Sequence, residues 1–168
     1  MRPSPTVRLA LCLALLLAAC SRPSTPAGPA ANAPAASGPI LPPAPMDPAK
    51  AAILATLPAA YRNADLDNGQ ARFAACRSCH SLERGAGPGV GPNLAGVFGR
   101  KAGSLPGYAY SYGLKALGIS WDADRINAWI SGPQAMVPGT KMAFAGLQDP
   151  KDRIDVVAYL RVTTATPR

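Results

Sequence analysis

Two cysteines and a histidine fall together at Cys76, Cys79 and His80, in the stretch "AACRSCHSL", and His80 is the one histidine of the 168-residue chain. A Cys-x-x-Cys pair serves three chemistries, namely a redox dithiol, half of a zinc site, and covalent attachment of haem. Each of these needs a different fold around the motif. This stretch therefore constrains the structure more than any other.

The three chemistries make different demands on the rest of the chain. A redox dithiol needs a strand that leads into a helix, and the chain has no alternating strand-like stretches. A structural zinc site needs four ligands, and one histidine with two usable thiols falls one short. Haem attachment needs only what is present, because the two sulfurs bond to the porphyrin and the histidine ligates the iron. The motif predicts one haem c, covalently bound through Cys76 and Cys79 and ligated by His80.

The start of the chain reads as an export signal. Arg2 and Arg8 are followed by an apolar run over 9–19 that is too short to cross a bilayer. Its end, "LAAC", resembles the lipobox of bacterial lipoproteins, which implies cleavage after residue 19 and a lipid on Cys20. An ordinary secretory signal and an uncleaved anchor are the alternatives, and Cys12 shows that cysteine also occurs within the apolar run.

Residues 21–48 contain nine prolines among alanine, glycine and serine. Such a segment buries too little apolar surface to fold, so we expect a lipidated cysteine and tether over 20–48 and one domain over 49–168. Without Arg2 and Arg8, 15 of the 17 basic residues remain against 9 acidic ones. This charge suits acidic protein partners or an anionic membrane. Nucleic acid is not expected, because no run of Lys and Arg with interleaved aromatics occurs.

Helical patterns predict an all-α domain. They occur at 49–57, 66–79, 123–130 and 150–163. Pro58 ends the first pattern, Asp122 is positioned to cap the third, and Pro150 to begin the last. Between Gly85 and Gly118, glycines and prolines favour turns over helices. A loop this long suits a domain that wraps around a large rigid group.

The second axial ligand of the iron is narrowed by elimination. A second histidine is excluded, which leaves methionine, lysine or an open position. Met136 and Met142 are the methionines of the domain. Pro138 and Gly139 predict a turn just before Met142, which suits presentation of its thioether.

Residues 65–164 resemble a class I cytochrome c, close to mitochondrial cytochrome c and its short bacterial relatives. The resemblance rests on motifs in the same order: "GQARFAACRSCH", "GPNLAGVFGRKAGSLPGYAYS", "GISW", "VPGTKMAFAG" and "DVVAYL". It implies an all-α fold of three to five helices wrapped around one covalently bound haem c, with long loops. It assigns the second axial position to Met142 and leaves Met136 as a packing residue.

The resemblance also implies what surrounds the haem. The carbonyl of Pro92 would accept a hydrogen bond from the outer nitrogen of His80. The other implied roles are two donors to a buried propionate, a charge that balances it, and a residue on the methionine side: Tyr110, Trp121, Arg100 and Thr140. Plain core packing is the alternative for the aromatic residues.

Two positions depart from the mitochondrial pattern. Trp129 stands where those proteins have a tyrosine that hydrogen-bonds the axial sulfur, and an indole donates but cannot accept. Leu114 stands where an asparagine is usual near the propionate. We expect an altered hydrogen-bond network with both iron ligands kept.

The resemblance implies an electron carrier rather than an enzyme, with a thioether ligand that raises the reduction potential. We expect a monomeric, membrane-tethered monohaem protein that carries single electrons between a quinol-oxidising, cytochrome bc-type complex and a terminal oxidase or periplasmic reductase. This duty places it on the periplasmic side of the bacterial cell envelope, at the inner rather than the outer membrane. The alternatives are a dedicated electron-entry haem subunit of a periplasmic dehydrogenase or reductase, and a haem enzyme or gas sensor with an open iron.

A charge asymmetry predicts how the carrier docks. Four basic residues flank the segments expected around the exposed haem edge: Arg77, Lys101, Lys115 and Lys141. Asp149, Asp152 and Asp155 lie on the last predicted helix, away from that edge. This arrangement predicts salt-dependent docking on acidic sites of respiratory membrane complexes. A generic solvated surface is the alternative.

Overall fold

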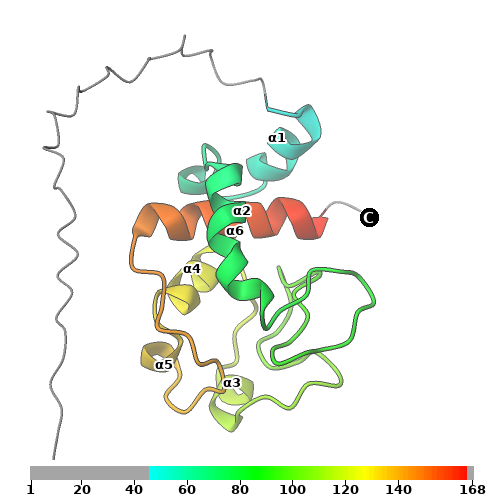
Figure 1. Ribbon diagram of the computed structural model, residues 1–168, viewed down its shortest axis with the longest axis vertical. Helices are drawn as coiled ribbons and strands as arrows, with labels where there is room; N and C mark the ends of the chain where they lie inside the picture. The colour runs from blue at the N-terminus through cyan, green and yellow to red at the C-terminus, as the bar shows by residue number, and fades with distance from the viewer. Residues whose placement is uncertain (1–45, 166–168) are drawn as a thin grey trace, which may run out of the picture. The chain divides into compact units, whose positions relative to one another are not determined.

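The computed structural model describes residues 46–165, and within that range the fold is all-α, as predicted, with one isolated bridge between Lys101 and Ser120 in place of strands. The predicted signal peptide 1–19, Cys20 and the tether up to residue 45 lie outside the described residues. Figure 1 shows α6 running through the middle of the domain, crossed by α2. The helices are α1 (Pro48–Ala55), the 3-10 helix η1 (Ala59–Tyr61), α2 (Leu66–Arg77), α3 (Tyr112–Ala116), α4 (Ala123–Ser131), α5 (Pro133–Met136) and α6 (Pro150–Ala165).

Local capping explains where the helices begin. The side chain of Asp122 accepts a hydrogen bond from the Arg125 amide and caps α4, as predicted. Helix α1 begins one residue earlier than predicted, because Asp47 caps it and Pro48 takes the first helical position. Helices α3 and α5 and the turn η1 were not predicted. Helix α3 forms inside the Gly- and Pro-rich middle, where Ser111 provides a cap that the composition of the segment conceals.

The crossing of α2 and α6 organises the domain. A Cβ atom added to Gly69 would lie 2.2 Å from the carbonyl oxygen of Asp155, so the two backbones meet at a distance that only glycine permits. Next to it the rings of Phe73 and Tyr159 pack at a centroid distance of 5.6 Å. This close contact fixes how α2, which leads into the Cys-x-x-Cys-His motif, is oriented on the core.

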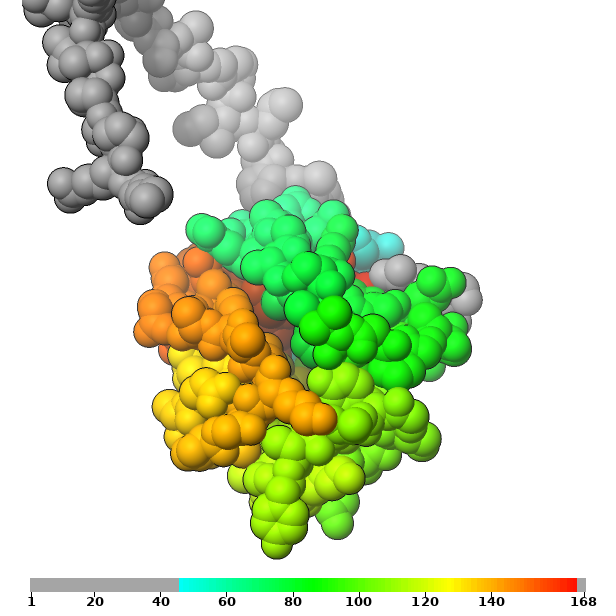
Figure 2. Space-filling view, turned by 60° about the horizontal axis from the view of Figure 1, so that its bottom comes forward, coloured from blue at the N-terminus to red at the C-terminus, as the bar shows by residue number. Residues whose placement is uncertain are grey.

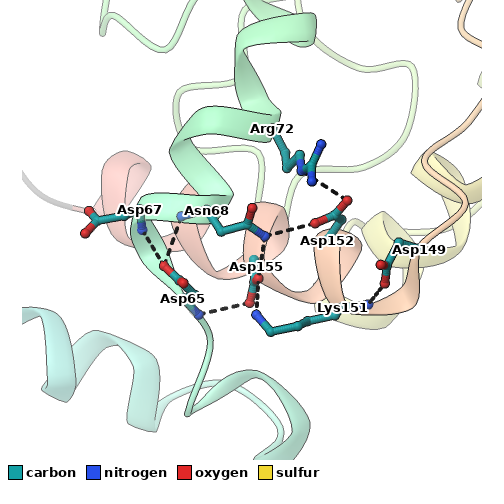
Figure 3. Close-up of polar contacts among 8 residues, drawn as sticks. All are labelled: Asp65, Asp67, Asn68, Arg72, Asp149, Lys151, Asp152 and Asp155. Carbon is teal, nitrogen blue, oxygen red and sulfur yellow. Dashed lines mark hydrogen bonds and ion pairs between the residues drawn. The ribbon is translucent and has the colours of Figure 1, made fainter. Parts of the chain in front are cut away.

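A buried carboxylate joins the same two helices, as Figure 3 shows. The side chain of Asp155 is 1% exposed and accepts hydrogen bonds from the Asp65 amide (2.9 Å), the Asn68 amide group (2.7 Å) and the Lys151 ammonium (2.6 Å). Asp155 lies on the last helix, as predicted, but its buried carboxylate adds no exposed negative charge to that side of the domain. It accepts the amide of Asp65, the residue that caps α2.

Helix α6 is buried around most of its circumference. Val157 and Ala158 are fully buried, while Ile154 and Arg161 are half-buried. Burial extends around the helix because α1, α2 and α4 all pack against α6. Within residues 46–165 no helix combines the length and the apolar character that a bilayer crossing requires.

The segment before α2 is part of the packed domain. The hydrophobic core includes Leu54 of α1, Tyr61 of η1 and Leu57 between the two, which are 1%, 3% and 5% exposed. The Tyr61 hydroxyl donates to a carboxylate oxygen of Asp124 in α4, at 2.9 Å. Burial, together with this hydrogen bond and the negative charge of Asp124, raises the pKa of Tyr61 to about 12. The domain therefore includes residues that precede the motif by some twenty positions.

Candidate haem site

The end of α2 presents the two cysteines. The helix ends at Arg77, and the amides of Cys79 and His80 both turn back to the carbonyl of Cys76, at 3.1 and 2.9 Å. Cys76 and Cys79 are both half-buried. One tight turn thus places both sulfurs and the imidazole at the same end of α2.

His80 is held as a neutral imidazole. Its Nδ1 lies 2.7 Å from the carbonyl oxygen of Pro92, which can only accept, so this nitrogen carries the proton and Nε2 keeps its lone pair. A Cβ atom at Gly91 would lie 2.5 Å from Cε1 of the ring, so the imidazole lies flat against a glycine. Burial lowers the pKa of His80, against the opposing effect of the hydrogen bond to Pro92. At neutral pH the ring is therefore in the form that binds iron.

The environment of the thiols favours haem attachment over the two alternatives. Burial, with a smaller effect of Cys79, raises the pKa of the Cys76 thiol, whereas a redox-active dithiol depends on a lowered pKa. Among residues 46–165 no cluster of three or more His, Cys, Asp and Glu side chains is placed to hold a metal ion. The motif begins in the last turn of α2, and residues 46–165 contain none of the strands that a thioredoxin-like site requires.

Met142 follows a defined turn. The Thr140 amide donates to the Val137 carbonyl at 3.1 Å, and Gly139 has φ +75°, so 137–140 is a turn with Pro138 and Gly139 at its centre, as predicted. The Trp129 indole Nε1 donates to the sulfur of Met142 at 3.1 Å. This contact leaves one lone pair of the thioether available to a metal.

A tryptophan pair supports this contact. Trp129 and Trp121 are 8% and 9% exposed, and their rings pack at a centroid distance of 5.6 Å and an interplanar angle of 56°. The backbone amide of Trp121 donates to the carbonyl oxygen of Arg100, and the carbonyl oxygen of Trp121 accepts from the amide of Gly99. These two hydrogen bonds connect Trp121 to the loop that contains Arg100. The indole that meets the sulfur is therefore held by a rigid helix on one side and a large ring on the other.

Arg100 and Tyr110 lie close enough to interact. Burial raises the pKa of Tyr110, and the positive charge of Arg100 opposes this rise. Burial lowers the pKa of Arg100, although its guanidinium donates to the carbonyl oxygens of Asn93 and Ala95. A half-buried cation beside a half-buried phenol is an environment suited to an anionic group.

A furrow opens on one face of the domain. Figure 2 shows it between the orange segment that follows α5 and the green segments at the end of α2 and beyond. An open cavity of about 560 Å³ lies beside Cys79 and His80, with Phe73, Leu82 and Tyr159 among its lining residues. Met142 and Trp129 are not among the residues that line this cavity.

The remaining predicted residues are distributed as follows. Thr140 is 7% exposed, and its hydroxyl is 3.5 Å from the Met142 amide. Leu114 is buried in the core at 8% exposure. The four predicted docking residues are all exposed: Arg77, Lys101, Lys115 and Lys141. Arg77 donates to the hydroxyl of Tyr159, however, and Lys141 donates to the carbonyl of Ala109 at 2.6 Å.

Two polar residues near the site were missed by sequence reasoning. Asn93 is 5% exposed, donates to the Glu83 carbonyl at 2.8 Å and accepts from the Ala95 amide at 2.7 Å, which braces the loop that carries Pro92. Gln134 of α5 contacts the backbone on either side of the peptide bond between Gly139 and Thr140. The sequence "GPN" marks Asn93 as a turn residue, while no local pattern distinguishes Gln134 from a surface glutamine.

Comparison with known proteins decides among the haem proteins. The sequence profile of the family described as Cytochrome c matches residues 66–164. The chain belongs to the cytochrome c family. Cytochrome c2 of Rhodomicrobium vannielii is 46% identical over 101 residues, covering 60% of this chain and 81% of the relative. Cytochrome c of Arabidopsis thaliana is 46% identical over 89 residues, covering 53% and 80%.

Solved structures agree. Cytochrome cH from Methylobacterium extorquens matches with a TM-score of 0.53 and 46% identity, covering 57% of this chain and 96% of that one. The class I cytochrome c fold is thus confirmed, and the chain is a monohaem electron carrier rather than an enzyme. The matched region begins at residue 66, so α1 and η1 precede the part shared with the family.

As a cytochrome c, the protein binds one haem c covalently through Cys76 and Cys79. The residues present fit that group. The donor set offers a neutral imidazole nitrogen and a thioether sulfur, each with its other hydrogen-bonding position already occupied. The glycine beneath the His80 ring leaves the space that a flat imidazole needs. When bound, haem supplies the one-electron couple of the iron.

Proposed function

We propose that His80 and Met142 are the two axial ligands of the haem iron, so that the protein cycles electrons without an open coordination site. The observation that carries this proposal is the hydrogen bond from Trp129 to the Met142 sulfur, which orients a thioether on the segment where the family resemblance expects it. Thioether ligation favours the ferrous state and a raised potential, as a carrier requires. Pro92 orients the imidazole.

The surroundings support an iron held with little freedom. We assign Tyr110 and Trp121 as donors to a haem propionate and Arg100 as the cation that balances its charge. Thr140 lies on the methionine side. The support for these roles is the burial of Trp121 and Thr140 and the electrostatic proximity of Arg100 to Tyr110.

We propose that the carrier docks through exposed basic residues on acidic sites of respiratory membrane complexes. It would take electrons from a quinol-oxidising complex and deliver them to a terminal oxidase or periplasmic reductase. Lys101 and Lys115 lie on neighbouring segments, because a Cβ atom at Gly103 would be 2.9 Å from the Cα of Lys115. Together with Lys141 they supply three exposed positive charges. Arg77 adds a fourth at the end of α2. Without Arg2 and Arg8, 15 basic residues remain against 9 acidic ones.

We propose that residues 1–19 are removed as a lipoprotein signal, that Cys20 carries the lipid, and that 20–48 tethers the domain on the periplasmic side of a membrane, the inner one by preference. The support lies in the sequence: an apolar run ending in "LAAC", followed by a Pro-rich segment. Packing of α1 and η1 onto the core then marks where the tether ends and the domain begins.

One set of experiments tests these assignments together. The holoprotein should stain for haem on a denaturing gel and show a weak methionine–iron absorption in its ferric spectrum, and Met142→Ala should lose that absorption. Metabolic labelling with palmitate should mark the wild type and not Cys20→Ala. Extraction in high salt separates a mobile carrier from an electron-entry subunit, because a permanent subunit would co-purify with its dehydrogenase or reductase. A ferric spectrum without the methionine absorption would contradict the ligand assignment.

A further inference from the structure

The loop that leads to Met142 is fastened by a single glutamine. Gln134 lies in the short helix α5, and its Nε2 donates to the carbonyl oxygen of Thr140 at 2.8 Å. Its Oε1 accepts from the amide of Gly139 at 3.2 Å. One side-chain amide thus engages a donor and an acceptor of consecutive residues, immediately before the segment that carries Met142.

Within residues 46–165, neither of these two backbone groups has a hydrogen-bond partner other than Gln134. The turn itself uses the Thr140 amide and the Val137 carbonyl. The Gly139 amide and the Thr140 carbonyl would otherwise depend on water, which imposes no geometry. The side chain of Thr140 is 7% exposed, so the point that Gln134 holds lies at the boundary between the surface and the core.

The loop is also held from the other direction. Lys141 donates to the carbonyl of Ala109 at 2.6 Å, and a Cβ atom at Gly113 would lie 2.9 Å from Val137, so α3 packs against the start of the loop. Trp129 holds the sulfur itself. Of these contacts, the one made by Gln134 holds the backbone of the turn itself. Met142 could move away from the iron only if this backbone also moved.

We propose that Gln134 is a positioning residue that keeps the Met142 thioether in place by fastening the turn at 139–140. The proposal rests on the proposed function, in which Met142 ligates the iron. Its side-chain amide favours the loop conformation in which the thioether is presented and disfavours the conformation in which it withdraws. Removal of the amide should leave the fold intact and make the methionine easier to displace.

Imidazole is the probe. It binds ferric iron only when the thioether leaves, so one iron–sulfur bond breaks, one iron–nitrogen bond forms, and no electron is transferred. Titration of the ferric holoprotein with imidazole, followed by loss of the methionine–iron absorption, measures this exchange. We expect Gln134→Met to increase the apparent imidazole affinity about threefold to tenfold, the equivalent of one or two modest hydrogen bonds. Gln134→Glu should increase it at least as much, because its carboxylate would face the Thr140 carbonyl.

Gln148→Met is the matched control. Gln148 is another exposed glutamine, six residues after Met142 in the sequence. Its Nε2 makes long hydrogen bonds to the carbonyl oxygens of Ser131 and Ala145, at 3.4 and 3.5 Å. Its substitution should change the imidazole affinity less than twofold. Because the titration is made where every variant is almost fully folded, a general loss of stability, measured separately in urea, does not shift it.

The outcomes are distinct. Wild-type protein without a methionine–iron absorption would overturn the proposed function before any variant is compared. If that absorption is present, an imidazole affinity of Gln134→Met within twofold of wild type would overturn the positioning role. Equal increases in Gln134→Met and Gln148→Met would overturn it as well, because the effect would then not come from the turn. If Gln134→Met fails to fold, Gln134 is a structural residue and the proposal is overturned in favour of that role.

Discussion

Replacing Asp155 by asparagine tests how the α2–α6 crossing is held. Asparagine keeps the shape of the side chain and an acceptor for the Asp65 amide. It removes the negative charge that accepts the hydrogen bonds from the Asn68 side chain and the Lys151 ammonium (Figure 3). The hydrogen bond from Asn68 is to a charged group that is 1% exposed, and such bonds contribute about 1.5 to 3 kcal/mol. The Lys151 side chain is 67% exposed, so its ion pair contributes little. We expect Asp155→Asn to lower the free energy of unfolding by about 2 to 3 kcal/mol.

Urea denaturation of the ferric holoprotein at pH 7 measures the free energy of unfolding. Because urea is uncharged, it does not screen the ion pair between Lys151 and Asp155. Lys151→Met is the control and should have a much smaller effect. A loss below about 0.5 kcal/mol in Asp155→Asn, or an equal loss in Lys151→Met, would refute the view that the buried donors dominate.

The difference in unfolding free energy between the wild type and Asp155→Asn should depend on pH. Burial alone would raise the pKa of Asp155, but hydrogen bonds from Lys151, Asn68 and the Asp65 amide outweigh it and hold the pKa below its usual value. The carboxylate therefore stabilises the fold above the unfolded pKa of about 4, and this contribution is lost as the pH falls through the lower folded value. The stability difference between wild type and Asp155→Asn should shrink below about pH 4.

Three further predictions follow from single contacts. Trp129→Phe removes the hydrogen-bond donor to the Met142 sulfur and so makes the thioether more electron-rich. The reduction potential, measured by redox titration, should fall. An unchanged potential would show that this hydrogen bond does not tune the iron. Gly91→Ala places a methyl group 2.5 Å from the His80 ring and should sharply reduce the yield of haem-stained protein, and a normal yield would show that the ring has room to move. Tyr61→Phe removes the hydrogen bond to Asp124 and should cost about 1 kcal/mol at pH 7. Because the raised pKa of Tyr61 contributes stability that is lost between about pH 10 and about 12, the variant should also lose less stability than wild type over that range in urea titrations; an equal loss would contradict the assignment.

The motif, the four main helices and the turn before Met142 are all determined by local signals. Asp122 caps α4, Pro150 begins α6, and Pro138 and Gly139 form a turn. Each of these effects involves residues only a few positions away, so the local sequence predicts it. The hydrogen bond from His80 to Pro92 spans only twelve positions and follows from the family resemblance.

Features that depend on distant partners could not be read in this way. Asp155 has the sequence context of a surface acid, and only the arrival of α2, some ninety positions earlier in the chain, explains why it is buried. The same holds for Gln134 and for the packing of α1 on α6, where helix propensity gave the element but not its neighbours. Helix α3 was missed because a cap at Ser111 outweighs the glycines and prolines around it.

The ferric absorption spectrum of purified Met142→Ala, compared with that of the wild type, tests the central claim most directly. The account predicts that the wild type shows the weak methionine–iron absorption and that the variant, still carrying covalent haem, lacks it. Retention of the absorption in Met142→Ala would contradict the claim that this thioether and the His80 imidazole together hold the iron.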